Sequence, residues 1–189
     1  MKRLTQILST IQSIDFAILD FIQAHMRAPF LDKVMPFITH LGESGIIWII
    51  LAVVLICIKK YRREGFTVAV ALVLCLIFCN MLLKNIVART RPFDINTMIE
   101  PIISLPTDYS FPSGHTTASF ASAAALLLCK NKLLGIPALM LAVLIAFSRL
   151  YLYVHFPSDV IGGMVFGAIL AFAAYRVMNK IYEKRKNHA

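Results

Sequence analysis

Long runs of apolar residues separated by short basic clusters constrain this chain more than any other feature. Five runs are typical of membrane-spanning helices, and they cover residues 45–58, 66–83, 115–129, 133–153 and 158–178. Several are shorter than the roughly 20 residues that cross a bilayer, but flanking residues can lengthen each helix. With 59% hydrophobic and only 15% charged residues, the composition fits a membrane protein better than a soluble domain. We therefore predict an all-α, polytopic membrane helical bundle that forms a single domain over residues 1–189.

Residues 1–41 form a segment of a different kind. Isoleucines recur at near-helical spacing within residues 4–26, while Asp15 and Asp20 interrupt the apolar pattern. Such a pattern is typical of an amphipathic helix that lies on a membrane or packs on a bundle. A sixth span over residues 4–26 is the alternative. Residues 30–41 are typical of a second, shorter amphipathic piece.

Small residues at four-residue spacing mark the last apolar run. Gly163, Gly167 and Ala171 would lie on one face of a helix, where small side chains let transmembrane helices approach closely. We predict that this face packs inside the bundle. A contact face for a second copy of the chain is the alternative, and the sequence does not determine the oligomeric state.

The basic residues predict which connections share a side of the membrane. The formal net charge is +9, which in a soluble protein would suggest nucleic-acid binding. Here the basic clusters lie between or after apolar runs, at 59–63, 130–132 and 176–186, which suits a membrane surface and not a nucleic-acid partner. By the positive-inside bias these segments face the cytoplasm. The connections 84–114 and 149–157 then both face outward.

Ionisable residues gather at the edges of the apolar runs in these two outward connections. Such residues are costly at membrane depth and are usually functional. Each has an ordinary explanation when taken alone, since a lysine can extend to the interface and an acid suits the first turn of a helix. Together, three cations and two helix N-termini, at 113 and 158, suit a phosphate with two ionised oxygens. The candidate phosphate ligands are Lys84, Arg91, Ser113, Gly114 and Arg149.

Two histidines in the same connections could divide the chemistry of phosphoryl transfer. His155 lies four residues before Asp159, whose carboxylate could bond one ring nitrogen and leave the other facing a substrate. His155 would then be the nucleophile that forms a phosphohistidine. His115 would protonate the departing oxygen and later take a proton from water.

Neither a metal nor another cofactor is expected. The remaining acids of the outward connections, Asp94, Glu100 and Asp108, show no ligand-like spacing to a histidine. The four cysteines lie inside apolar runs without the spacing of a zinc site or of a disulfide framework, so we expect them to fill the core.

Three short motifs resemble the signatures of the type 2 phosphatidic acid phosphatase (PAP2) superfamily. They are Lys84-x6-Arg91-Pro92, Pro112-Ser113-Gly114-His115 and Ser148-Arg149-x5-His155-x3-Asp159, so the catalytic motifs fall within residues 84–159. The resemblance implies a helical bundle whose motifs meet at the outer membrane surface, and metal-independent hydrolysis of a lipid phosphate or diphosphate. It implies the same roles for the eight residues named above. Vanadium haloperoxidases have a similar pocket but are soluble, and the apolar runs argue against that activity.

Small bacterial members of that family suggest a substrate and a location. The resemblance favours hydrolysis of undecaprenyl diphosphate to undecaprenyl phosphate and inorganic phosphate, with phosphatidylglycerophosphate or phosphatidic acid as alternatives. It implies a multi-pass protein of the bacterial plasma (inner) membrane with its active site on the extracytoplasmic side. A non-catalytic lipid-phosphate binder or transporter is the alternative from a different class, and it would need neither His155 nor Asp159. The connection 93–111 is either a small lid that touches lipid or an ordinary loop.

Overall fold

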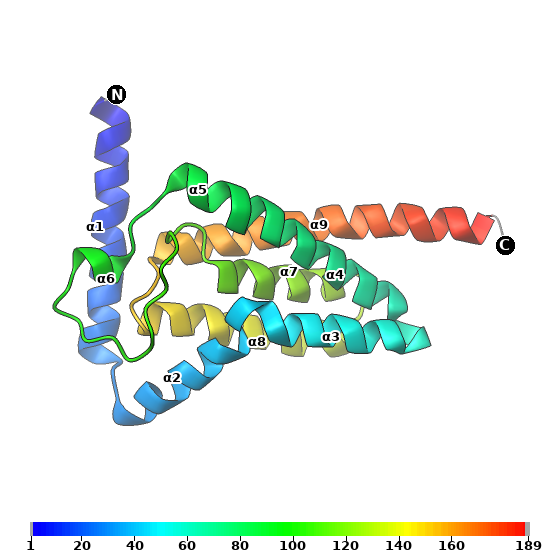
Figure 1. Cartoon of the computed structure of the whole chain (residues 1–189), viewed down its shortest axis with the longest axis horizontal. Helices are drawn as coiled ribbons and strands as arrows, with labels where there is room; N and C mark the ends of the chain where they lie inside the picture. Colours follow the sequence, from blue (N-terminus) through cyan, green and yellow to red (C-terminus); the bar gives the residue numbers. More distant parts are fainter. Residues whose placement is uncertain (1, 188–189) are drawn as a thin grey trace.

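The computed structural model describes residues 2–187, and this part of the chain is helical with no strand. The helices that make up the bundle run side by side along the long axis of the molecule (Figure 1). They are α3 (Ile46–Cys57), α4 (Arg62–Cys75), α7 (Gly114–Leu128), α8 (Lys132–Tyr151) and α9 (Pro157–Asn187). Each predicted apolar run overlaps one of them, so the prediction of an all-α bundle is confirmed.

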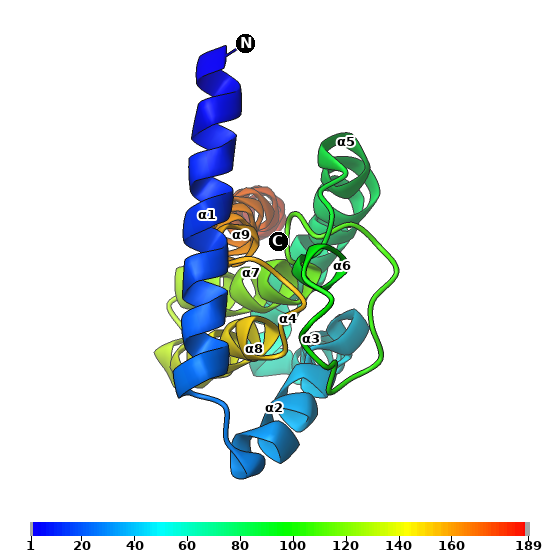
Figure 2. The same cartoon turned by 90° about the vertical axis from the view of Figure 1, so that its left-hand side faces the viewer.

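The N-terminal helix α1 (Lys2–His25) runs across one end of this bundle (Figures 1 and 2). By length and apolar composition, its Thr5–His25 stretch is one of five candidate membrane spans in the described residues. The others are Pro29–Cys57, Lys59–Ile95, Lys132–Tyr151 and Pro157–Lys184. Because α1 lies transverse to α7, α8 and α9 in both views, its orientation favours a helix that packs on the bundle over a sixth parallel span.

Helix α7 is too short to be among those five candidates, and the prediction that residues 115–129 span the membrane stays a prediction. It has 15 residues, and at 1.5 Å per residue it is about 22 Å long, less than the roughly 30 Å of a hydrocarbon core. It lies among α4, α8 and α9, which pack against it. Other helices of the bundle therefore surround most of α7.

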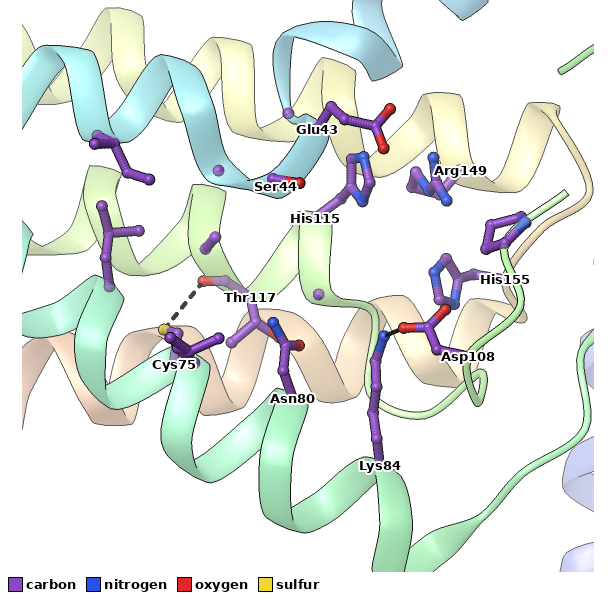
Figure 3. Close-up of a pocket in the computed structure, with 18 of the residues that line it drawn as sticks. Glu43, Ser44, Cys75, Asn80, Lys84, Asp108, His115, Thr117, Arg149 and His155 are labelled. Atoms are coloured by element: carbon purple, nitrogen blue, oxygen red, sulfur yellow. Dashed lines mark hydrogen bonds and ion pairs between the residues drawn. The ribbon is translucent and has the colours of Figure 1, made fainter. Parts of the chain in front are cut away.

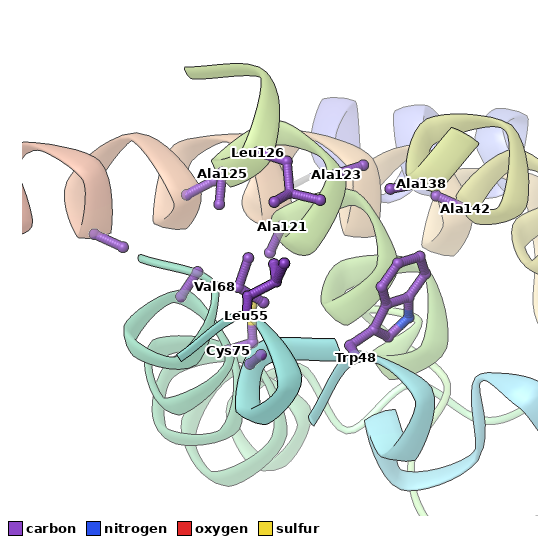
Figure 4. Close-up of a cluster of buried hydrophobic side chains, with 14 of the residues drawn as sticks. Trp48, Leu55, Val68, Cys75, Ala121, Ala123, Ala125, Leu126, Ala138 and Ala142 are labelled. Carbon is purple, nitrogen blue, oxygen red and sulfur yellow. The ribbon is translucent and has the colours of Figure 1, made fainter. Parts of the chain in front are cut away.

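The centre of the bundle is built from small side chains, which allow this close packing (Figure 4). Ala121 and Ala125 of α7 are fully buried, and Trp48 of α3 donates a hydrogen bond of 2.9 Å to the Ser119 hydroxyl. A Cβ atom at Gly167 of α9 would lie 2.6 Å from the carbonyl oxygen of Thr117. The small-residue face of α9 thus packs against α7, as predicted, and is not free for a second copy of the chain.

The connections sort to the two ends of the bundle as the charge pattern predicts. The basic connections around 58–61 and 129–131 lie at the end where α9 finishes, while the connections 88–113 and 152–156 lie at the other end beside α1 (Figure 1). The remaining elements are short or irregular: α2 (Pro29–Leu41), η1 (Glu43–Gly45), η2 (Lys59–Tyr61), the π-helical η3 (Leu76–Leu83), α5 (Lys84–Val87) and α6 (Pro92–Ile95).

The cysteines only partly follow the sequence-based expectation. Cys75 and Cys79 are buried and Cys129 is half-buried, but Cys57 is exposed. Cys57 is the last residue of α3, next to the basic connection, so the expectation of a core position is wrong there.

Replacing Gly167 by alanine should destabilise the bundle, because the added methyl group overlaps the backbone of α7. Overpacking of this kind costs about 1–3 kcal/mol, which we expect to appear as a lower midpoint of thermal unfolding in detergent. Val165→Ala is the control, since Val165 lies on the same helix and is exposed. A midpoint equal to that of the unchanged protein would show that α7 and α9 are further apart than the structure has them.

Candidate active site

The three sequence motifs converge at the end of the bundle that carries α1 (Figure 3). Lys84 lies where η3 passes into α5, Arg91 precedes α6, and Arg149 lies in the last turn of α8. A cavity of about 720 Å³ opens between them. Six of the eight predicted site residues line this cavity, and they are Lys84, Arg91, Gly114, His115, Arg149 and His155.

Three buried cations face this cavity. Lys84, Arg91 and Arg149 are each less than a tenth exposed, and Arg149 donates a hydrogen bond of 2.6 Å to the Thr39 hydroxyl of α2. Among the described residues, Nε of Arg149 and Nε2 of His115 are buried polar atoms without a hydrogen-bond partner. Because such atoms are rare in native structures, both are suited to a ligand that enters the cavity.

A carboxylate already lies between two of the cations. Asp108 forms ion pairs with Lys84 and, at 2.6 Å, with Nη2 of Arg91 (Figure 3). Burial alone would raise the pKa of Asp108, but the hydrogen bond and charge of Lys84, together with the charge of Arg91, lower it to about 2. Asp108 is therefore ionised at neutral pH and stands in the place of an anionic ligand. No spacing in the sequence singles it out for this position.

The connection that carries Asp108 also forms part of the cavity wall. Ile103, Ser104, Leu105 and Pro106 line the cavity, so this segment covers the site from one side. That position favours the predicted lid over an ordinary surface loop.

His155 lies buried against the cations. Its Nε2 is 3.2 Å from Nη1 of Arg91, and the residue lies in the connection 152–156, between α8 and α9. Burial first, and then the charges of Arg91, Arg149 and Lys84, lower the pKa of His155 well below its ordinary value. The imidazole is therefore neutral at neutral pH and keeps the lone pair that a nucleophile needs.

The structure places Asp159 beside His155 without a direct hydrogen bond. Oδ2 of Asp159 lies 3.7 Å from Nδ1 of His155, beyond hydrogen-bond length. The carboxylate is fixed by other donors: the Ser110 hydroxyl and the Phe156 amide donate to Oδ2, and Arg89 donates to Oδ1 at 2.5 Å. The Ser110 hydroxyl also lies 3.5 Å from Nδ1 of His155. Sequence reasoning left both Ser110 and Arg89 out of the site.

Ser113 does not line the cavity, although it is a predicted phosphate ligand. It is fully buried; its hydroxyl accepts a hydrogen bond of 3.0 Å from Thr116, and its amide donates one of 3.2 Å to the carbonyl oxygen of Asp159. Gly114, the first residue of α7, does line the cavity. A role of Ser113 in phosphate binding stays a prediction.

Only one of the two predicted helix N-termini opens toward the cavity. That of α7 does, through Gly114. At the N-terminus of α9, the Ser158 amide donates a hydrogen bond of 2.9 Å to Oδ1 of Asp15 in α1. The carboxylate of Asp15 thus occupies the N-terminus of α9. This N-terminus is therefore not available to bind a phosphate.

The cavity extends from the cations into an apolar groove between α3 and α4. Side chains that recur about one helical turn apart line the groove, namely Ile49, Val53 and Ile56 of α3, Ala69, Leu72 and Val73 of α4, and Leu76 of η3. The same side of this helix continues through the π-helical η3 to Asn80 and Lys84 (Figure 3). π-Helical turns are frequent at functional sites, and the apolar pattern of 66–83 gave no sign of one.

An anion pocket at the head of an apolar groove, within a bundle of membrane-type helices, defines a multi-pass membrane protein that acts on the phosphate of a lipid. The profile of the PAP2 superfamily matches residues 64–183, and the chain belongs to this family. It is accordingly a lipid phosphatase or diphosphatase, as the three motifs predict.

Curated relatives and solved structures agree with this assignment. The chain is 32% identical over 147 residues to an undecaprenyl-diphosphatase of Sulfolobus acidocaldarius, covering 78% of this chain and 70% of that protein. It is 32% identical over 176 residues to phosphatidylglycerophosphatase B of Bacillus subtilis, covering 85% and 82%. The crystal structure of the transmembrane PAP2 type phosphatidylglycerolphosphate phosphatase from Bacillus subtilis superposes with a TM-score of 0.75 at 31% identity, over 91% of this chain and 88% of that one. Aquifex aeolicus LpxE gives a TM-score of 0.74 at 26% identity, over 85% and 94%.

The substitution Asp108→Asn should strengthen binding of inorganic phosphate. The wild-type carboxylate competes with an anion for Lys84 and Arg91, and the neutral amide removes that competition. We expect the inhibition constant for phosphate to fall several-fold, by about 1 kcal/mol of binding free energy for a partly exposed charge. Asp94→Asn, elsewhere in the same connection, is the control. Weaker phosphate binding by Asp108→Asn would show that Asp108 organises the cations and does not compete for them.

Proposed function

We propose that this protein hydrolyses a membrane lipid phosphate or diphosphate through a phosphohistidine on His155, without a metal ion. One observation carries the proposal: a buried imidazole, with its Nε2 3.2 Å from Nη1 of Arg91, lines the same cavity as the three cations and the apolar groove. The phosphate of a lipid whose tail follows the groove would reach this nitrogen. The roles of the eight predicted site residues are part of the proposal.

The proposed reaction has two steps at one phosphorus atom. In the first, Nε2 of His155 forms the new P–N bond while the P–O bond to the lipid or to its remaining phosphate breaks. His115 gives a proton to the departing oxygen. In the second step, water attacks the phosphohistidine, His115 takes the proton, and inorganic phosphate leaves with the imidazole restored.

Three fixed cations would supply the charge that a metal supplies in other phosphatases. Lys84, Arg91 and Arg149 surround the position of the transferred group and would stabilise the charge on its oxygens. No group of three His, Cys, Asp or Glu side chains in the searched part of the chain gathers in a metal-binding arrangement. The experiment below tests metal independence by measuring activity in the presence of EDTA.

Undecaprenyl diphosphate is the substrate we favour, converted to undecaprenyl phosphate and inorganic phosphate. Relatives named as undecaprenyl-diphosphatases in Sulfolobus acidocaldarius and Bacillus subtilis support it. The apolar groove between α3 and α4 suits the long hydrocarbon chain of such a lipid. Phosphatidylglycerophosphate and phosphatidic acid are the alternatives, and the similarity to phosphatidylglycerophosphatase B supports the first of them.

The location and domain organisation complete the proposal. The basic connections lie at the end opposite the cavity, and the positive-inside bias assigns their end to the cytoplasm. The active site would then face the extracytoplasmic side of a bacterial plasma membrane. We propose that residues 1–189 act as one domain, in which 84–159 carry the catalytic groups and 1–41 pack on the site from outside.

The role of His155 as the nucleophile is tested by measuring phosphate release with purified protein in detergent, in the presence of EDTA. Wild-type protein should release inorganic phosphate from undecaprenyl diphosphate, and His155→Ala should lower that rate by more than about 1,000-fold, since loss of a nucleophile removes the covalent step. His40→Ala, an exposed histidine on α2, is the matched control. Labelled substrate should leave an acid-labile phosphate on wild-type protein after a neutral quench. The same background release of phosphate by wild type and His155→Ala, on a panel that includes phosphatidylglycerophosphate and phosphatidic acid, would contradict the proposal. It would favour a non-catalytic lipid-phosphate binder or transporter.

A second experiment tests whether the groove between α3 and α4 binds the hydrocarbon chain of the substrate, by placing a large side chain in it. Val73→Trp places a large ring in the wall between α3 and α4, at a position that is already exposed to the lipid side. We expect the KM for undecaprenyl diphosphate to rise about tenfold, while hydrolysis of a short water-soluble prenyl diphosphate stays near wild type, because only the long chain needs the groove. Val143→Trp, exposed on α8 and outside the cavity wall, is the control. Equal effects on long and short substrates would place the hydrocarbon chain elsewhere.

A further inference from the structure

Arg89 lies at the centre of a second charged network, behind the catalytic histidine. Its Nη1 donates to Oδ1 of Asp159 at 2.5 Å and to the Ser158 hydroxyl at 2.7 Å, and its Nη2 donates to Oδ2 of Asp15 at 2.7 Å. The guanidinium also lies 4.1 Å above the ring of Phe156. Four groups from three segments of the chain thus hold one side chain that does not line the cavity.

Asp15 of α1 is the anchor of this network. It is 2% exposed, and besides Arg89 it accepts hydrogen bonds from the amide and the hydroxyl of Ser158. A carboxylate buried in this way is stable only when its charge is paired and its oxygens are bonded. Asp15 therefore fixes Arg89 and the first turn of α9 at the same time.

Asp159 connects this network to the nucleophile. One oxygen, Oδ1, accepts from Arg89, and the other, Oδ2, accepts from Ser110 and lies nearest Nδ1 of His155. Together with the donors to Oδ2, the bond from Arg89 to Oδ1 holds the orientation of the carboxylate, and so the distance from Oδ2 to the imidazole. Closing the present 3.7 Å gap to a hydrogen bond needs only a small shift of groups that Arg89 holds.

We propose that Arg89 and Asp15 are positioning residues for the nucleophile: Asp15 on the N-terminal helix holds Arg89, Arg89 orients Asp159, and Asp159 orients His155. The proposal rests on the proposed function, in which His155 attacks phosphorus. It assigns to α1 a role in catalysis beyond packing on the bundle, and it explains why an acidic residue interrupts the apolar pattern of that helix.

The test compares kinetic constants of single and double variants. We expect Asp15→Asn to lower kcat about tenfold and Arg89→Gln about 100-fold, with KM within about twofold of wild type, because misplacing a reacting group by 1 Å can cost that much while substrate binding is untouched. Arg89→Lys should recover part of the loss, since it keeps the charge but loses the fork that reaches two carboxylates. The double variant Asp15→Asn/Arg89→Gln should be slower than Arg89→Gln by less than the loss that Asp15→Asn causes alone, because Asp15 acts on Asp159 mainly through Arg89 and only in part through Ser158.

Asp20→Asn is the matched control. Asp20 lies on the same helix and accepts a hydrogen bond of 3.1 Å from Tyr153 in the 152–156 connection, but it has no bond to Arg89 or Asp159. Near wild-type kcat for Asp20→Asn together with the loss for Asp15→Asn supports the proposal. Equal losses for the two, or a double variant whose loss is the product of the single losses, would overturn it, since α1 would then contribute only to folding.

Two further results separate the possible failures. If Arg89→Gln does not fold, as seen by loss of a monodisperse peak in size-exclusion chromatography, the comparison of Asp15→Asn with Asp20→Asn decides alone. If wild-type protein hydrolyses no lipid of the panel, the proposed function fails. If wild type is active and both Asp15→Asn and Arg89→Gln match it, the proposed function stands and the positioning role is wrong.

Discussion

The burial of three cations around one cavity is the constraint on which the site depends. Moving a charge out of water costs several kcal/mol unless an opposite charge and hydrogen bonds replace the water. Arg91 donates to backbone carbonyl oxygens as well as to Asp108, whereas Lys84 is paired with Asp108 and Arg149 donates to Thr39. Asp108 supplies the missing anion. Its side chain is 53% exposed, against 9% for Lys84 and 3% for Arg91, so the carboxylate can return to water while the cations cannot. The pocket is thus built to exchange one anion for another.

A second set of paired charges, formed by Arg89 with Asp15 and Asp159, lies behind the cation pocket and, among the described residues, shares no ion pair with it. Arg89 and Arg91 are two residues apart, yet Arg89 is bonded to Asp15 and Asp159, whereas Arg91 faces the cavity and Asp108. If Asp159 paired with a cation of the pocket, it would reduce the charge available to a phosphate. By bonding to Arg89 it lies beside His155 and leaves the cations of the pocket unpaired with it. Because Arg89 and Arg91 have separate partners, the same end of the bundle holds both an anion site and the carboxylate that a nucleophilic histidine needs.

The features that the sequence predicted are those carried by short-range patterns. Apolar runs and basic clusters predicted the bundle and its two ends, and residue types at fixed spacing predicted that Lys84, Arg91, His115, Arg149 and His155 share a cavity. The missed features depend on contacts between distant residues or on backbone geometry. Asp15 meets Arg89 across 74 positions, η3 widens its helix without a change in the apolar pattern, and Ser113 turns inward toward Thr116. No local pattern encodes these contacts.

The transverse position of α1 relates the site to the membrane surface. Ile7, Leu8, Ile11 and Ile14 are all exposed on α1, and a helix with such a face lies at the boundary between head groups and hydrocarbon. Asp15 joins α1 to the first turn of α9, so a boundary at the level of α1 would pass close to Asp159 and the cation pocket. The groove between α3 and α4 leads from that level into the bundle, alongside the hydrocarbon. A lipid would therefore keep its phosphate near the interface and its tail in the membrane while it reacts, which removes the need to lift the whole molecule out of the bilayer.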